Sequence, residues 1–252
     1  MSTRRRKLDK ATAEEVRELL GDAIRYIRNE VKFLERVKKD MSKKAVEELV
    51  RLGVLHWFED RLYDLVDELN YVYLRPRLYG DRNYVTGFAE DLKDPLFEID
   101  MRADDVMRAE LKRLEKTLDV IHEIKKEVDN SPDRERLLER WREVERLVGE
   151  IKKWMEKVRG DINSFEITEA LEELDGKLAG VLIQLQNMIG VDEPLKHKKH
   201  VMSKGPLYAK MLKLYEKLYA IVEVLYLMYK VRKVVMDVDG YLYHIHDIAE
   251  EE

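Results

Sequence analysis

Acidic and imidazole side chains gather near the carboxyl end of the chain, in the segments 237–240 (DVDG) and 244–247 (HIHD). Carboxylates and imidazoles at this spacing can ligate a metal ion, and a carboxylate can attack phosphate as a nucleophile. The register of an EF-hand loop fails, because Gly240 at the sixth position puts His246, and not a glutamate, at the twelfth. We therefore expect no metal in this segment.

The apolar run that ends in Asp237-Val-Asp239-Gly240 resembles the first motif of the haloacid-dehalogenase-like phosphatases. The resemblance would make Asp237 the nucleophile and Asp239 the acid. That motif ends the first strand of an α/β domain, and the twelve residues after Gly240 are too few to build one. Asp-Gly between two apolar runs is also the strongest short signal for a β-hairpin. We predict a short C-terminal β-hairpin or extended tail over 237–246, with an extension of the last helix to about Val238 as the alternative.

Arginines, lysines and tyrosines gather in two segments between apolar repeats, and a basic run (RRRK) stands at 4–7. Guanidinium groups bind phosphate through two hydrogen bonds at once, and tyrosine rings stack on bases or fill a partner's pocket. The alternative is an ordered loop packed on the end of the fold and a solvated connector. The candidate partner- or phosphate-binding residues are Arg75, Arg77, Tyr79, Arg82, Tyr84, Lys196, Lys198, Lys199 and Lys204.

The stretch Arg51-Leu-Gly-Val-Leu-His56 resembles the Arg-x4-His ribonuclease motif of HEPN-domain helical bundles. The resemblance covers six residues and implies that Arg51 would bind phosphate and His56 would transfer a proton. Leu52 stands where that family prefers a polar residue, and the motif falls in the second predicted helix instead of late in the bundle. The alternative is a surface arginine and a partly buried histidine.

Few other residues of the sequence match a motif for catalysis or metal binding. The pairs His56-x-x-Glu59 and Asp119-x-x-His122 each put two metal ligands on one helix face, but a di-iron bundle needs two Glu-x-x-His motifs and two further carboxylates. The sequence has no cysteine, which excludes disulfides, thiolate zinc sites and iron–sulfur clusters. It has no glycine-rich phosphate loop. We expect a protein that is not an enzyme, with no cofactor, no metal and no catalytic residue.

Apolar residues recur with alternating gaps of four and three over most of the chain, which is the spacing of helices that pack side by side. We predict an all-α fold: an elongated antiparallel bundle of about six long helices with heptad-like seams. We expect it to form a single domain over 1–252. The helices are expected near 11–40, 43–74, 95–129, 132–159, 165–189 and 206–236, with a loop over 75–94, a basic linker over 190–205 and a tail over 237–252.

Capping residues mark several of these boundaries. Ser42 precedes the second helix as a potential N-cap, and Asn163-x-x-Glu166 is a potential capping box before the fifth. One charge interrupts the apolar run of the sixth helix: Glu223 in "AIVEVLYLMY". Buried there, Glu223 must either pair with a lysine or arginine of a neighbouring helix or have a raised pKa.

Charged residues make up 39% of the sequence, yet its formal net charge is only −5, which argues against general, charge-driven nucleic-acid binding. Abundant Lys, Glu and Arg without cysteine is typical of hyperthermophiles, so we expect a heat-loving source. The basic amino terminus has no apolar core of a signal peptide, and no stretch is apolar enough to span a bilayer. We expect a cytoplasmic protein with no membrane partner.

These observations favour a non-enzymatic helical interaction or scaffold protein. It would dock on a protein partner through its long loop and its tail, and homo-oligomers are expected because six seams can bury apolar faces between chains. The alternative is a nucleic-acid-associated accessory factor that uses Arg75, Arg77, Arg82 and the basic linker 196–204. A HEPN-like ribonuclease with Arg51 and His56 is the third hypothesis.

Overall fold

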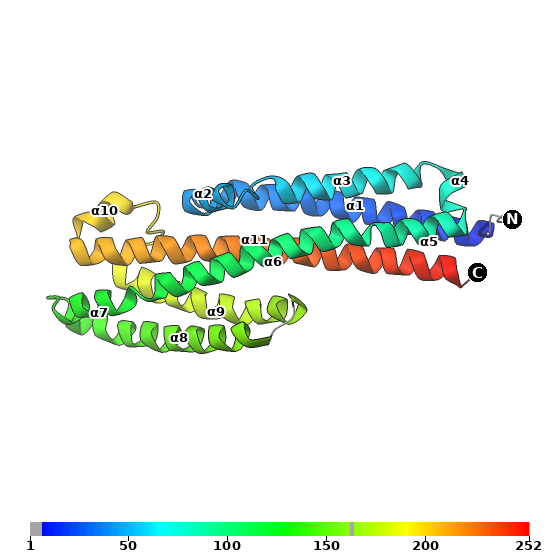
Figure 1. Ribbon diagram of the computed structural model, residues 1–252. Helices are drawn as coiled ribbons and strands as arrows, with labels where there is room; N and C mark the ends of the chain where they lie inside the picture. Colours follow the sequence, from blue (N-terminus) through cyan, green and yellow to red (C-terminus); the bar gives the residue numbers. More distant parts are fainter. Residues whose placement is uncertain (1–6, 162–163, 252) are drawn as a thin grey trace. The chain divides into compact units, whose positions relative to one another are not determined.

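The computed structural model of the chain describes residues 7–161 and 164–251, with side chains outside 158–170. Helices cover nearly all of this part of the chain, so the all-α prediction is confirmed (Figure 1). The predicted capping box Asn163-x-x-Glu166 and the basic residues 4–6 lie outside the described residues. The helices are α1 (Lys10–Asp40), α2 (Lys43–Arg51), α3 (Trp57–Tyr73), α4 (Pro76–Tyr79), α5 (Arg82–Asp91), α6 (Lys93–Leu118), α7 (Ile121–Asp129), α8 (Arg134–Asp161), α9 (Ser164–Ile189), α10 (Lys198–Ser203) and α11 (Pro206–Glu250).

Residue contacts divide the chain into two compact units. Unit 1 contains α1, the chain from Leu49 to Asp105, and α11 from Leu227 onward. Unit 2 contains Met41–Glu48 and the chain from Val106 to Tyr226. The expectation of a single domain over 1–252 stays a prediction. Among the described residues, no helix is both long and apolar enough to cross a membrane.

In unit 1, α1 and α3 pack side by side in opposite directions (Figure 1). The start of α1 lies beside the end of α3, where the Arg17 guanidinium carbon is 5.3 Å from the ring centre of Tyr73. The end of α1 lies beside the start of α3, where Lys38 Nζ is 2.6 Å from Glu59 Oε1. Both side chains of this second pair are at most 10% exposed, so it is a buried ion pair.

The last part of α11 completes the core of unit 1. The Tyr26 hydroxyl of α1 donates a hydrogen bond to Asp237. On α6, Asp100 accepts two hydrogen bonds from Arg232, at 2.8 Å from Nε and 3.2 Å from Nη2. This part of α11 runs antiparallel to α1 and to the first part of α6 (Figure 1).

In unit 2, α8 and α9 pack antiparallel, as Figure 1 shows. Arg140 Nη1 donates to Gln184 Oε1 at 3.4 Å, and Lys177 Nζ lies 3.0 Å from Glu150 Oε2. Trp141 of α8 is fully buried, which puts its large apolar ring in the core of the unit. The apolar seams predicted for these two helices therefore face the core of unit 2.

The predicted helix over 43–74 is two helices. Gly53 lies between them with φ +68, a left-handed conformation that glycine adopts without strain. The Val54 amide donates to the Leu49 carbonyl and the Gly53 amide donates to the Val50 carbonyl, which is the Schellman ending of a helix. The buried residues on either side of the break, Leu49 and Val54, are five positions apart instead of three or four, and the prediction missed this shift in spacing. The predicted helix over 95–129 is likewise divided, into α6 and α7.

The predicted β-hairpin over 237–246 is wrong, because α11 continues as one helix to Glu250. Val238, Leu242, Ile245 and Ala249 are all buried, at spacings of four, three and four that only a helix can produce. Packing on the core thus overrides the local turn preference of Asp239-Gly240.

Two segments predicted as connectors are partly helical. The predicted loop over 75–94 contains α4 and α5, with Pro76 at the start of α4 and Asp81 as the N-cap of α5. The predicted linker over 190–205 contains α10. These helices are too short to repeat their apolar positions, so the sequence shows no helical period there.

Candidate functional site

The Arg/Tyr segment predicted to bind a partner lies at one end of unit 1. We call residues Tyr71–Tyr84 the α3–α5 corner, since they span the last turn of α3, all of α4 and the first residues of α5. Pro76 fixes the turn into α4, because its ring holds φ in the helical range. The Tyr84 amide donates to the Asp81 carboxylate at 3.4 Å, which starts α5. The corner is therefore an ordered structure.

Arg75 is held in place on this corner by its neighbour on α3. Its guanidinium carbon lies 3.7 Å from the ring centre of Tyr71, a cation–π contact, and Arg75 Nη1 donates to the Tyr71 carbonyl at 2.7 Å. Tyr84 is held in a similar way, because its ring stacks on Phe88 with centres 6.3 Å apart. These contacts fix the side chains before any partner arrives.

Apolar side chains of the corner are exposed. Leu74 is 69% exposed and Tyr71 is 49% exposed. Arg77 is exposed beside them on α4, while Tyr79 is half-buried. An ordered patch that combines leucine, tyrosine and arginine has the residue types that supply most binding energy at protein interfaces.

Arg82 has a structural role instead. Its guanidinium donates to the Glu250 carbonyl, so it satisfies a backbone acceptor in the last turn of α11. The Leu8 amide donates to the Gly80 carbonyl at 3.1 Å, and His246 Nε2 of α11 lies 3.5 Å from Glu90 Oε1 of α5. The corner is thus attached to the end of α11 and to the beginning of the chain.

The lysines of the 196–204 linker, in unit 2, are largely engaged within the chain. Lys196 Nζ lies 2.6 Å from Glu193 Oε1, and Lys198 forms an ion pair with Glu216. Lys204 Nζ donates to the Ile189 carbonyl at 2.8 Å, at the end of α9. Lys199 is exposed. These contacts reduce the positive charge that the linker offers to a phosphate.

Arg51 and His56, the candidate ribonuclease pair, lie on opposite sides of the turn between α2 and α3. Arg51 is the last residue of α2, His56 directly precedes α3, and both are exposed. Over residues 7–161 and 164–251, no three histidine or acidic side chains gather closely enough to hold a metal ion.

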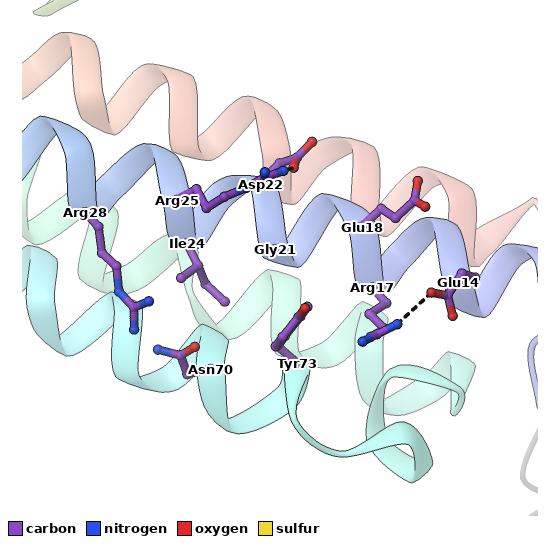
Figure 2. Close-up of a pocket in the computed structure, with 10 residues that line it drawn as sticks. All are labelled: Glu14, Arg17, Glu18, Gly21, Asp22, Ile24, Arg25, Arg28, Asn70 and Tyr73. Carbon is purple, nitrogen blue, oxygen red and sulfur yellow. Dashed lines mark hydrogen bonds and ion pairs between the residues drawn. The ribbon is translucent and has the colours of Figure 1, made fainter.

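A groove between α1 and α3 went unpredicted. It has a volume of about 620 Å³ and is lined by three acids, three arginines, Asn70 and Tyr73 (Figure 2). Arg17 and Glu14 form an ion pair of 2.7 Å at one end, and the Tyr73 ring lies so close to α1 that a Cβ at Gly21 would be 3.2 Å from it. Arg17 also interacts electrostatically with Tyr79, so the groove adjoins the α3–α5 corner. Only the folded arrangement of α1 on α3 reveals it.

The buried Glu110 and the half-buried Glu223 of unit 2 have raised pKa values. Burial raises the pKa of Glu110 to about 7, and a hydrogen bond to Glu48 acts in the same direction, against the nearby Arg113. Arg113 Nη1 lies 3.0 Å from Glu110 and 3.6 Å from Glu48. The two carboxyl groups, with Arg113, form a buried cluster, in which a shared proton avoids two adjacent negative charges.

Burial also raises the pKa of Glu223, although hydrogen bonds from Ser42 oppose the shift. Glu223 Oε1 accepts from the Ser42 amide at 3.0 Å, and Oε2 accepts from the Ser42 hydroxyl at 2.5 Å. Of the two expectations for Glu223, the structure favours a raised pKa over an ion pair. Ser42 in turn caps α2, as expected, by accepting from the Ala45 amide at 3.4 Å.

Comparison of the chain with protein-family models, with curated proteins and with solved structures found no match.

Proposed function

We propose that this chain is a non-enzymatic helical interaction protein, and that it binds an acidic segment of a protein partner at the α3–α5 corner. The observation that carries the proposal is the exposed group of Tyr71, Leu74 and Arg77 together with the half-buried Arg75, which is stacked on Tyr71. Burying an exposed leucine contributes about 1.5–3 kcal/mol, which is enough to anchor a transient contact. Because Arg75 is already stacked on Tyr71, little side-chain entropy is lost when it meets a carboxylate.

The charge of the corner indicates the chemistry of the partner. Arg75 and Arg77 follow the exposed Leu74 closely in the chain, while Asp81 of the same corner is used to cap α5. An acidic segment with an apolar anchor would place its anchor on Leu74 and its carboxylates against the two arginines.

The alternative of a nucleic-acid accessory factor is less well supported by the contacts. Arg82 is bonded to the end of α11, and three of the four candidate lysines of the linker contact acceptors in the chain. The groove also carries Glu14, Glu18 and Asp22, which repel phosphate.

Fluorescence anisotropy with labelled twelve-residue probes tests the proposal. The probes are a Glu/Asp peptide with a central Leu-Trp pair, its Lys-substituted counterpart, and a single-stranded RNA. We expect binding of the acidic peptide alone, weakened at least tenfold by Leu74→Ser and by Arg77→Glu. Val50→Ser, at another exposed apolar residue outside the corner, is the matched control and should leave binding unchanged. Binding of RNA with loss on Arg77→Glu would instead establish the nucleic-acid alternative, and binding unaffected by both corner variants would refute the proposed site.

A further inference from the structure

The outward side of the last part of α11 carries a glycine for which the chain itself gives no packing reason. At about 100° per residue, Gly240 points directly away from the buried residues of this helix. A Cβ placed on Gly240 would meet no heavy atom within 4 Å. The residues that α11 buries in unit 1 are Leu227, Met228, Val231, Arg232, Val234, Val235, Val238, Leu242, Ile245 and Ala249. Glycine is unfavourable in a helix interior, so a second element that approaches closely would give it a role.

Exposed apolar residues lie on both sides of Gly240. Met236 is 42% exposed and Tyr243 is 57% exposed, four residues before and three residues after it. Lys233 and Asp247 lie seven residues before and seven residues after, and seven residues is within about 20° of two full turns. Gly240 is therefore at the centre of a row of residues along the outer side of α11, with the cation Lys233 at one end and the anion Asp247 at the other.

We propose that two copies of the chain associate through this face, with their α11 helices antiparallel and crossing at Gly240. A two-fold axis through Gly240 places the residue n positions before it opposite the residue n positions after it in the second copy. The α11 outer face consists of Lys233, Met236, Asp237, Gly240, Tyr243, His244 and Asp247.

The pairs that this axis creates are complementary. Lys233 lies opposite Asp247 of the second copy, and each pair occurs twice. Met236 lies opposite His244 of the second copy, where a thioether can contact an imidazole ring. A parallel pairing would set Lys233 against Lys233 and Asp247 against Asp247, so like charges disfavour it.

Hydrogen bonding is conserved in the antiparallel pair. Within one chain the Tyr243 hydroxyl is bonded to Asp247, which raises the pKa of Tyr243. The two-fold axis puts Tyr243 opposite Asp237 of the second copy, so its hydroxyl can donate there and leave Asp247 to Lys233. Asp237 also accepts from Tyr26 of its own chain, and a carboxylate has enough lone pairs for both donors.

Close approach is possible at the crossing because Gly240 has no side chain. A contact of two helices is at the small end of protein interfaces, so we expect a transient dimer with a dissociation constant on the order of 100 μM. This interface does not involve the α3–α5 corner, and a failure of either proposal leaves the other standing.

Cysteine cross-linking tests the geometry, because the chain has no cysteine of its own. Gly240→Cys puts a thiol on the two-fold axis, and we expect rapid oxidation to a disulfide-linked dimer. Gly149→Cys is the matched control, because Gly149 is an exposed helical glycine of α8 whose added Cβ also meets nothing within 4 Å. Equal cross-linking of the two variants would overturn the proposal.

Charge exchange tests the pairing. In sedimentation equilibrium, Lys233→Glu and Asp247→Lys should each weaken the dimer at least tenfold, and the double variant should restore it. Circular dichroism on the same samples checks that α11 stays folded. A wild-type chain that remains monomeric up to about 0.5 mM, or single variants that dimerise as well as the wild type, would refute the interface. A double variant no better than the single ones would refute the antiparallel register.

Discussion

The buried cluster of Glu48, Glu110 and Arg113 makes the stability of unit 2 depend on pH in an unusual direction. Folding raises the pKa of Glu110 from 4.5 to about 7, so the folded chain binds a proton more tightly than the unfolded chain. By linkage, this contribution to stability is fully present below about pH 4.5 and is lost as pH rises to about 7. This rise in the pKa corresponds to about 3 kcal/mol, the amount by which an ionised Glu110 destabilises the fold above pH 7.

Glu110→Gln removes this dependence while keeping the shape. The amide can donate to Glu48 and accept from Arg113, as the protonated carboxyl group does. We expect equal stability of variant and wild type at pH 4.5 and an advantage of the variant of about 3 kcal/mol at pH 8. Urea unfolding across this pH range gives the difference, since each midpoint and slope yield the free energy of unfolding.

Fluorescence can confine the measurement to unit 2. Trp141 and Trp154 are buried there, so a Trp57→Phe background removes the tryptophan of unit 1. Glu123→Gln, at an exposed position of α7, is the control and should follow the wild type at every pH. A difference between Glu110→Gln and wild type that is the same at pH 4.5 and pH 8 would refute the proton-sharing explanation.

Three further outcomes are expected. Lys38→Met should destabilise unit 1 by about 3–5 kcal/mol, because it leaves Glu59 buried without its cation, and Lys38→Met with Glu59→Leu should recover most of the loss in urea unfolding. Gly53→Ala should cost about 1–2 kcal/mol, because the turn after α2 holds φ at +68, whereas Gly87→Ala, inside α5 with open space around it, should not destabilise. The charge-rich, cysteine-free composition predicts a calorimetric Tm above the mesophilic range of about 45–65 °C, and a Tm within that range would contradict the expected heat-loving source.

The fold class was readable from the sequence because long helices repeat their apolar positions many times. The inner faces of α8 and α9 follow the predicted seams, and the buried residues of α11 continue the same spacing beyond Val238. Helix ends were harder to predict, because they depend on single residues. Gly53 ended α2 in the middle of the predicted helix over 43–74, whereas Ser42 was recognisable as a cap from its residue type alone.

The arginines of the candidate site were predictable from the sequence, whereas Tyr71 and Leu74 were not among the predicted binding residues. Arginine and tyrosine at 75–84 indicated a binding segment, but sequence could not show that Arg82 closes α11 while Leu74 is left exposed. Leu74 is the first residue after the last turn of α3, and its side chain is 69% exposed. The groove between α1 and α3 depends on side chains of two helices far apart in the chain, so no local pattern contains it.

Asp237-Val-Asp239-Gly240 shows how a strong local signal and a global constraint can give different results. Asp-Gly favours a turn, but a turn here would remove Leu242, Ile245 and Ala249 from the core of unit 1. Burial of these three side chains contributes several kcal/mol, while a glycine inside a helix costs only about 0.5–1 kcal/mol, so the helix prevails. The smaller cost is still present in the folded chain, on a face where nothing of the chain itself approaches Gly240. Close approach of a second copy at this position would offset that cost, which is why the glycine matters more for association than as a turn.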